Sequence, residues 1–210
     1  MNSTIFKLGG SLLEQPELPR LMQLLISQRP DTVPVFVIGG GRAANLVREW
    51  DRIHGLQSDQ AHWLAVDAMT FNERLLVSVC PAATLVDDDR AARAAIRSGH
   101  LPVLRARQFL EHSAATVVAE LPGSWEVTSD SIAATVAVAW EAGELVMVKS
   151  VNRPTGQASA AAAARAGLVD AYFPQVVEGI AAVGWANGRT EATIERWLPL
   201  SASATSPVPA

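Results

Sequence analysis

The stretch TIFKLGGSLL, residues 4–13, decides the fold. It begins with apolar and β-branched residues that are typical of a buried strand, and it ends at Gly9-Gly10-Ser11, where a backbone without Cβ atoms can approach a ligand closely. Lys7 lies inside this strand, although lysine is depleted in buried strands. One interpretation is an edge strand with a solvated lysine and a tight turn. The other is a phosphate-binding turn with Lys7 acting on the phosphate.

A second stretch, VPVFVIGGG at residues 33–41, has the same arrangement. Its apolar run predicts a strand buried on both faces, and Gly39, Gly40 and Gly41 lead into a helix. The residues expected on one face of that helix are Ala43, Ala44, Leu46, Val47 and Trp50. Backbone amides at the start of a helix attract anions. Two such turns in one sheet indicate a site that holds both the donor and the acceptor of a phosphoryl group.

Strands and helices alternate along the rest of the chain, which predicts an α/β fold with a mainly parallel sheet between helices. Ligands of such sheets bind beyond the carboxyl ends of the strands, where both glycine turns lie. The expected elements are a helix from Pro19 to Ser27, a helix over 59–78, strands in AATLVDD and LPVLRAR around the helix RAARAAIRSG, the helix SIAATVAVAWEAG, the strand ELVMVKSV, a helix in ASAAAAARAGLVDAYF and a last helix, TEATIERWL.

Two charged residues of the second half complete the candidate site. Thr128 or Ser129 is a natural N-cap, and Asp130 falls in the first turn of its helix, where the helix dipole favours a carboxylate. Taken by itself, Asp130 is explained by a role in starting the helix. The presence of Lys7 in the same fold favours instead a carboxylate that holds lysines in position. Lys149 ends its strand as Lys7 does, and ammonium groups can neutralise a transferring phosphoryl group.

Composition narrows the class of protein. The length predicts a single domain over residues 1–200, followed by a flexible small-residue tail over residues 201–210. The net charge of -4 argues against nucleic acid as a partner, and the lack of a long apolar run argues against a membrane. One cysteine, Cys80, and no signal-peptide pattern fit the cytoplasm. The scattered histidines, among them His62, are expected to be solvated or capping, and no residue is assigned as a metal ligand.

Six stretches then establish a resemblance to a known family. In order they are FKLGGSLL, VFVIGGGRAAN, GHLPVL, TSDSIAA, LVMVKSV and GWANGR, and they extend over about residues 4–198. This ordered set resembles the amino acid kinase family, which includes aspartate, glutamate and uridylate kinases. The resemblance implies a three-layer αβα sandwich that forms a homodimer or a higher homo-oligomer. It also implies ATP and Mg²⁺ over the C-terminal half and a small-molecule acceptor over the N-terminal half.

The resemblance assigns roles to matching positions. It implies that Lys7, Asp130 and Lys149 are catalytic, with Lys7 on the transferring phosphoryl group and Asp130 organising the lysines. The implied nucleotide-binding residues are Gly9, Gly10, Ser11, Lys149, Ser150 and Val151, and the implied substrate-binding residues are Gly39, Gly40, Gly41, Arg42, Thr128 and Ser129.

One departure from the family keeps several functions open. Many members carry a second catalytic lysine further on, but PTGQASAAAAARAG, residues 154–167, has none, so either Lys149 substitutes for it or Lys7 works alone. The short length and LPGSWEVTSDSIAATVA resemble the small kinase of methanofuran biosynthesis, which phosphorylates an aminomethylfuran-methanol phosphate for a one-carbon cofactor. Alternatives are a kinase for an amino-acid carboxylate or UMP, and a non-catalytic nucleotide- or oxyanion-binding protein. A dinucleotide-binding enzyme is a third, since GGGRAA at 39–44 matches G-x-G-x-x-A and Asp59 follows about 20 residues later.

Overall fold

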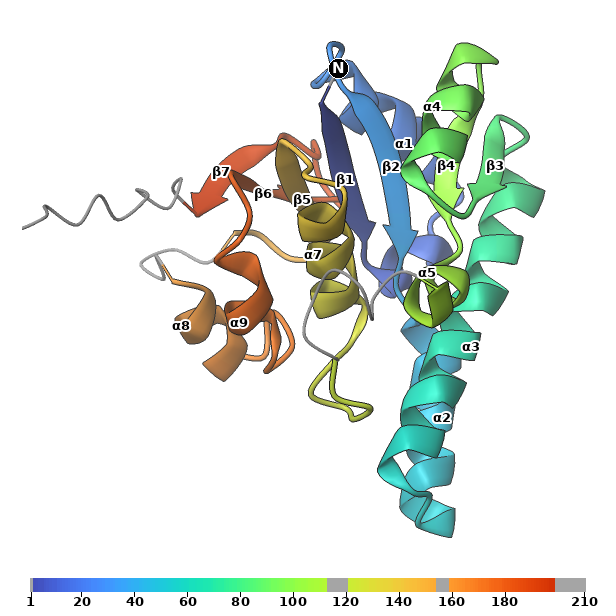
Figure 1. The fold of residues 1–210 in the computed structure, drawn as a ribbon, viewed down its shortest axis with the longest axis vertical. Coiled ribbons are helices and arrows are strands. Elements are labelled where there is room, and N and C mark those ends of the chain that lie inside the picture. Colours follow the sequence, from blue (N-terminus) through green and yellow to red (C-terminus); the bar gives the residue numbers. More distant parts are fainter. Residues whose placement is uncertain (1, 113–120, 154–158, 199–210) are drawn as a thin grey trace, which may run out of the picture.

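A computed structural model of the chain describes residues 2–112, 121–153 and 159–198. The expected tail, 201–210, lies outside these ranges. Seven strands form one sheet in the order β3-β4-β2-β1-β5-β6-β7, and every neighbouring pair is parallel except β6 and β7 (Figure 1). The strands are β1 Ser3–Leu8, β2 Val33–Ile38, β3 Ala83–Val86, β4 Leu101–Leu104, β5 Glu144–Lys149, β6 Val183–Asn187 and β7 Glu195–Leu198.

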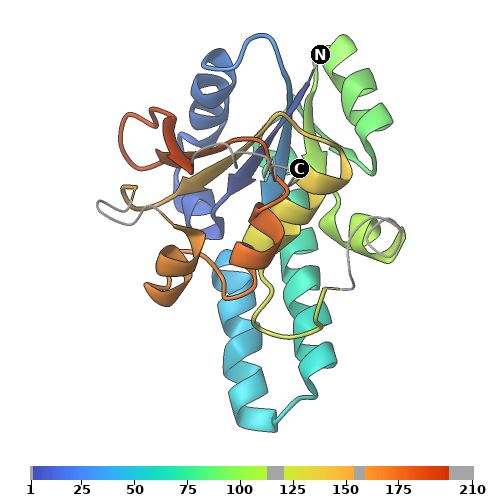
Figure 2. The same ribbon diagram turned by 60° about the vertical axis from the view of Figure 1, so that its left-hand side comes forward.

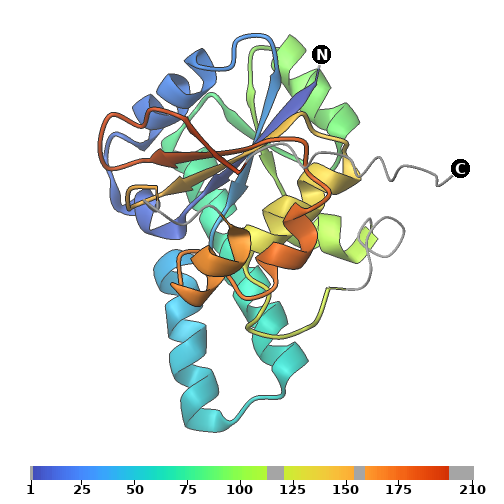
Figure 3. The same cartoon turned by 90° about the vertical axis from the view of Figure 1, so that its left-hand side faces the viewer.

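Helices cover both faces of the sheet and confirm the predicted α/β sandwich. Figures 2 and 3 show α1 on one side of the sheet, with α7 and α9 on the other. The helical elements are the short 3-10 helix η1 Gly10–Glu14, α1 Leu18–Ser27, α2 Gly41–His54, α3 Ser58–Val79, α4 Asp89–Arg97, α5 Ala106–His112, α7 Ser129–Ala139, α8 Ala160–Arg165 and α9 Phe173–Val177. None of the helices that the structure describes has both the length and the apolar character needed to cross a membrane.

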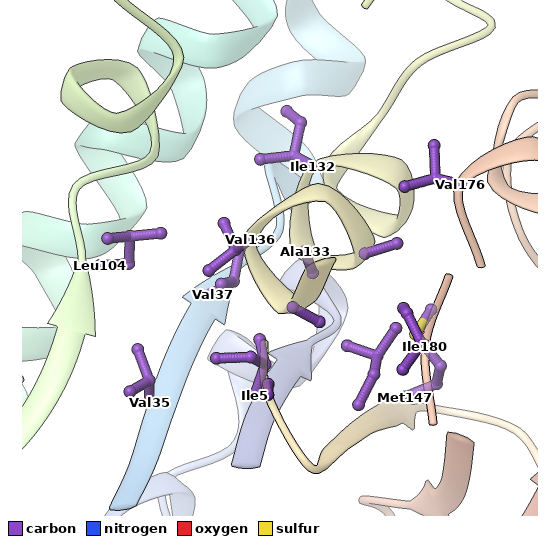
Figure 4. Packing of buried hydrophobic residues seen from close by; sticks show 14 of the residues in the cluster. Ile5, Val35, Val37, Leu104, Ile132, Ala133, Val136, Met147, Val176 and Ile180 are labelled. Atoms are coloured by element: carbon purple, nitrogen blue, oxygen red, sulfur yellow. The ribbon is translucent and has the colours of Figure 1, made fainter. Parts of the chain in front are cut away.

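Alternate residues of β1 enter two different cores. Phe6 packs on the α1 side, where its ring stacks on Phe36 at a centroid distance of 5.2 Å. Ile5 packs on the α7 side, in the cluster that contains Ile132 and Met147 (Figure 4). Because side chains of a strand alternate between faces, Lys7 shares the α7 side with Ile5. The strand therefore delivers Lys7 to the carboxyl edge of the sheet beneath the start of α7.

The last predicted helix, TEATIERWL, is wrong, because this segment contains strand β7. Its Trp197 is buried against Trp185 of β6 and Phe173 of α9, at centroid distances of 4.9 and 5.8 Å. The free edge of β6 supplies backbone hydrogen-bond partners that a helix would leave unused. Tertiary pairing therefore overrides the helical pattern of a short segment.

Helices α2 and α3 form an antiparallel hairpin that extends well beyond the sheet (Figure 1). Gly55, in a left-handed conformation with φ of 60°, ends α2 and allows the reversal. Val47 is the buried residue of α2, whereas Trp50, which periodicity placed on a core face, is 47% exposed. The prediction for Trp50 is wrong because this part of the hairpin extends beyond the sheet.

Candidate active site

The two glycine turns meet at the carboxyl edge of β1 and β2. The Gly9 amide donates to the carbonyl of Val148 on β5, and the Gly39 amide donates to that of Leu8, each at 2.8 Å. The turns approach so closely that a Cβ atom on Gly10 would lie 2.2 Å from the Gly41 amide nitrogen. Glycine is thus required at position 10, since no side chain fits between the two backbones.

Beside these turns, one carboxylate binds two lysines. Lys7 on β1 and Lys149 on the neighbouring strand β5 both reach Asp130 in the first turn of α7. The Lys7 Nζ–Asp130 Oδ1 distance is 2.8 Å, and Lys149 Nζ lies 2.8 and 2.7 Å from Oδ1 and Oδ2. Their side chains are only 6%, 14% and 6% exposed for Lys7, Lys149 and Asp130. Lys7 and Lys149 are also the only lysines in the sequence.

The ionisation of this cluster favours a bound anion. Burial alone would raise the pKa of Asp130, but the neighbouring charges of Lys149 and Lys7 outweigh burial and lower the pKa to about 2. Burial, helped by the charge of Lys7, lowers the pKa of Lys149 to about 8, although Asp130 opposes that shift. At neutral pH the cluster holds two positive charges against one negative charge. The cluster therefore has a net positive charge, carried by side chains that are nearly buried.

A cavity of about 440 Å³ opens directly onto this cluster. Most of the residues expected at the site line it: Lys7, Gly9, Gly10, Ser11, Gly39, Gly40, Gly41, Thr128, Ser129, Asp130, Lys149 and Ser150. The two expected residues that do not are Arg42 and Val151. Arg42 points to solvent and pairs with Glu14, and Val151 is 45% exposed while its carbonyl accepts the indole N–H of Trp185.

The far wall of the cavity comes from the hairpin and from the segment before α7. The Arg48 guanidinium lies 4.6 Å from the ring centroid of Trp125, whose indole N–H donates to Asp51 at 2.7 Å. His62 also lines the cavity, and the expectation that it is solvated or capping is wrong. It is buried, with Nδ1 3.3 Å from the Ser124 carbonyl oxygen, and burial lowers its pKa despite that hydrogen bond.

Two buried polar residues that sequence reasoning missed hold the site together. Asp170 accepts hydrogen bonds from the amide and hydroxyl of Thr128 and from the amide and hydroxyl of Ser131, so it fixes the start of α7. Asn72 donates to the carbonyl of Gly39 at 2.7 Å and fixes the second glycine turn. Both contacts join segments more than 30 residues apart, and no local pattern in the sequence marks either residue.

The dinucleotide alternative fails on geometry. It requires an acidic residue at the end of a second strand, where it would bind a ribose. Asp59, the residue at the right separation, instead lies in the first turn of α3. The G-x-G-x-x-A match at residues 39–44 therefore lacks its partner.

Comparison with known families decides the relationship. The model of the amino acid kinase family matches residues 2–153, which is most of the chain. The chain belongs to the amino acid kinase family. The resemblance seen in the ordered sequence stretches is confirmed at this level. A search of curated proteins found no match.

Solved structures of several kinases share the fold. Uridylate kinase from Archaeoglobus fulgidus superposes with a TM-score of 0.60 at 15% identity, over 94% of this chain and 99% of that one. UMP kinase from Ureaplasma parvum gives 0.57 at 14% identity, over 88% of each chain. Aspartate kinase from Synechocystis gives 0.63 at 13% identity, over 94% of this chain but only 40% of the other. At these identities the similarity shows the fold.

The residues around the cavity suit a metal ion that is bound to the phosphates of a ligand rather than to protein side chains. In the described parts of the chain, no group of three or more His, Cys, Asp or Glu side chains is gathered to hold a metal ion. The carboxylate oxygens of Asp130 accept from lysines, and those of Asp170 accept from amides and hydroxyls. Mg²⁺ often keeps several waters and binds through substrate phosphates, so these residues fit a magnesium–nucleotide complex.

Proposed function

We propose that this chain transfers the γ-phosphoryl group of ATP to a small metabolite. The observation that carries the proposal is Asp130, which holds Lys7 and Lys149 at the wall of a cavity between two glycine turns. In phosphoryl transfer the protein mainly positions groups and neutralises charge on the equatorial oxygens. A rigid pair of ammonium groups with a surplus positive charge is suited to that task.

In the proposed reaction, an oxygen of the acceptor attacks the γ-phosphorus while the bond to the β,γ-bridging oxygen breaks and ADP leaves. Lys7 and Lys149 contact the non-bridging oxygens in transit, and Asp130 keeps both ammonium groups charged and in place. Mg²⁺ bound to the phosphates would withdraw further negative charge. Since the three side chains are already hydrogen-bonded to one another, little reorganisation is needed during the reaction.

The proposed nucleotide side lies over the C-terminal half of the sheet. Gly9, Gly10 and Ser11 line the cavity next to Lys149 and Ser150 at the end of β5, and the backbone amides of Gly10 and Ser11 are proposed to contact the donor phosphates. A second cavity, of about 470 Å³, adjoins the ends of β5 and β6. Its walls include Asn152, Arg153 and Asn187, which offer polar groups for a nucleoside.

The proposed acceptor side lies over the N-terminal half, between the start of α2 and Trp125. Arg48 lines this end of the cavity, where it makes one hydrogen bond of 3.3 Å to Asn45 and no ion pair with any described residue. An unpaired guanidinium beside an indole suits an acceptor with both an anionic group and a planar ring. A phosphate monoester such as an aminomethylfuran-methanol phosphate, in methanofuran-type cofactor biosynthesis, has both features.

A non-catalytic nucleotide- or oxyanion-binding protein is the second candidate. The observation that favours it is the sequence of residues 154–167, which lacks the downstream lysine of many family members. Lys7 and Lys149 are the only lysines of the sequence, so no third lysine side chain is there to contribute.

The decisive experiment is incubation with ATP and Mg²⁺ and a panel of acceptors, with products detected by ³¹P NMR. The panel contains aminomethylfuran-methanol phosphate, UMP, aspartate and glutamate. A new diphosphate from the furan compound supports the full proposal. Turnover of UMP or an amino acid instead keeps the kinase and overturns the acceptor. ATP binding in calorimetry without transfer to any acceptor favours the second candidate.

A further inference from the structure

His62 of α3 is a buried titratable residue that the proposed reaction does not use. It lines the same cavity as the two lysines, although only 6% of the residue is exposed. Ala65, Val66 and Met69 line the cavity from the same helix, three, four and seven residues further on. Side chains at these spacings share one face of a helix, so the imidazole lies on the cavity side of α3.

The contact with Ser124 fixes which ring nitrogen of His62 carries a proton. Nδ1 lies 3.3 Å from the Ser124 carbonyl oxygen. A carbonyl oxygen can only accept a hydrogen bond, so Nδ1 must donate. Burial lowers the pKa of His62 and outweighs the opposing effect of this hydrogen bond, so the imidazole is neutral at pH 7. In a neutral imidazole with its proton on Nδ1, the other nitrogen, Nε2, is a hydrogen-bond acceptor.

The Nε2 atom has no partner among the residues that the structure describes. It is also not sealed inside the protein, in contrast to Glu73 Oε2, which is buried without a partner. An atom that is neither bonded nor sealed off lies next to open space. Because His62 is almost fully buried and lines the cavity, that space is the cavity. Nε2 therefore faces a bound ligand.

The position of His62 along α3 places it at the proposed acceptor end. A Cβ atom on Gly40 would lie 3.7 Å from the Ala65 carbonyl oxygen, so Ala65 is level with the second glycine turn. His62 precedes Ala65 by three residues, about 4.5 Å along the helix axis. Figure 3 shows the segment before α7 passing beside this part of the hairpin, and Trp125 of that segment lies against Arg48. The imidazole thus faces the part of an acceptor that is remote from the glycine turns.

The charges around the cavity make this vacant atom distinctive. The two lysines and Arg48 line the cavity and attract anions. The carboxylates of Asp130 and Asp170 also line it, but their oxygens already accept from lysines, amides and hydroxyls. A ligand that displaces water from the cavity leaves Nε2 of His62 unpaired unless the ligand itself supplies a donor. Leaving a buried polar atom unpaired is costly.

We propose that His62 selects an acceptor with an N–H or O–H group at the end remote from the glycine turns, and that Nε2 accepts a hydrogen bond from this group. The inference rests on the proposed function, because it takes this cavity to hold the acceptor. The acceptor then combines an anionic group, a planar ring and a hydrogen-bond donor. The aminomethyl group of the furan compound is such a donor, and so is the N3–H group of the uracil ring in UMP.

Calorimetry without ATP tests this selection apart from phosphoryl transfer. The first pair of ligands is aminomethylfuran-methanol phosphate and an analogue with a methyl group in place of the amine. The second pair is UMP and 3-methyl-UMP. In at least one pair the compound with the donor should bind about 10–100-fold more tightly, the range for a buried polar atom left without its partner. Equal affinity within both pairs, or no binding of either donor compound, overturns the proposal.

Two substitutions separate the roles of the two ring nitrogens. In His62→Asn the amide nitrogen can replace Nδ1 and keep the contact with Ser124, but the acceptor atom at Nε2 is lost. In His62→Gln the amide oxygen can replace Nε2. The asparagine variant should bind both members of the pair within about 3-fold, since the coupling between residue and donor is gone, and the glutamine variant should recover part of the preference. A purely structural role would weaken both ligands equally in both variants. An undiminished preference in His62→Asn would show that Nε2 does not contact the acceptor.

Nitrogen-15 NMR of the wild type tests the tautomer without any ligand. Near neutral pH the His62 ring should carry its proton on Nδ1, with its signals assigned by their absence in His62→Asn. The Nε2 signal should shift when the preferred compound is added, because the atom gains a hydrogen bond. A proton on Nε2, in the free protein or in the complex, overturns the proposal, because that nitrogen could then only donate.

The outcome for His62 is separate from the outcome for the kinase. Phosphoryl transfer in the ³¹P NMR assay without a donor preference keeps the proposed function and removes the role of His62. A donor preference that disappears in His62→Asn, without transfer to any acceptor, keeps the role of His62 and removes the kinase.

Discussion

Lys149 donates to both carboxylate oxygens of Asp130, at 2.8 and 2.7 Å, across the gap between the end of β5 and the start of α7. This pair joins the two halves of the molecule, because Lys7 of the first strand binds the same carboxylate. Removing Asp130 would leave two nearly buried positive charges without their partner, which is far costlier than losing a surface ion pair. The two lysines are therefore stable in this position only when Asp130, or another anion in its place, lies between them.

Substitution of Lys7 tests the proposed chemistry. Lys7→Ala should lower kcat by about 10²–10³, the usual effect of losing one group that stabilises transition-state charge. Far-ultraviolet circular dichroism should be unchanged, since Lys149 still pairs with Asp130. Near-normal turnover in a folded Lys7→Ala protein would remove Lys7 from the mechanism.

The pH dependence of kcat/KM should report Lys149. Its pKa of about 8 means that the ammonium form, which the mechanism uses, predominates below that pH and is lost above it. Activity should therefore fall as pH rises through about 8. Asp130, with a pKa of about 2, should cause no loss on the acid side near neutrality. In Lys149→Arg the alkaline fall should move to higher pH, because a guanidinium stays protonated there. An identical alkaline limb in both proteins would assign it to another group.

Two arginines near the second glycine turn should behave differently. Arg48 lines the cavity and Arg42 does not. Arg48→Ala should raise the KM for an anionic acceptor by about 10–100-fold, the range for a lost charge-assisted hydrogen bond, with a smaller effect on kcat. Arg42→Ala should leave both constants near the wild-type values. The reverse result would place the acceptor outside the cavity, next to Arg42.

Glu73 should make stability depend on pH. It is fully buried on α3, where Oε1 accepts from the Ala106 amide and Oε2 has no partner. Burial raises its pKa to about 7, despite that hydrogen bond and the charges of Arg105 and Arg74. The pKa of Glu73 is higher in the folded chain than in the unfolded chain. The protonated side chain therefore contributes fully to folding stability below about pH 4.5, and this contribution is lost as pH rises through 7.

Glu73→Gln should remove that loss. The variant should gain about 2–3 kcal/mol over the wild type above pH 7 and little below pH 5, from the pKa difference. Urea unfolding at pH 5 and pH 8.5 measures both values. An equal change at both pH values would show that Glu73 does not titrate between them.

Gly10 should tolerate no side chain. A Cβ atom there would lie 2.2 and 2.5 Å from backbone atoms of Gly41, and only separation of the two glycine turns could relieve the contact. Gly10→Ala should therefore lower both the melting temperature and activity. Gly123→Ala is the control, since its Cβ would meet Asp59 at an ordinary 3.5 Å. A Gly10→Ala protein as stable and active as the control would show that the turns need not touch.

Local patterns predicted the central strands and much of the site. Lys7 and Lys149 are visible in the sequence because a charged residue interrupts an apolar run, and the glycine turns because they follow such runs. Asp130 is visible as a helix-starting residue. These signals act within a few residues, which is the range that sequence patterns can report.

Long-range contacts account for what could not be predicted. Asp170 caps α7 from 42 residues away, and Asn72 holds Gly39 from 33 residues away. Strand β7 exists because β6 offers an edge, and Trp50 is exposed because the hairpin leaves the sheet. Each outcome depends on where other segments lie, which the residues concerned do not encode locally.

The placement of both lysines has a practical consequence. Apart from histidine, every other basic side chain of the protein is an arginine. Reagents that acylate or alkylate amines will thus find, besides the N-terminus, only the two ammonium groups beside Asp130. An amine-reactive dye becomes a probe of the cavity, and attachment to an amine-reactive support risks blocking it. Labelling through engineered surface cysteines avoids the problem, because the natural thiol of Cys80 is buried.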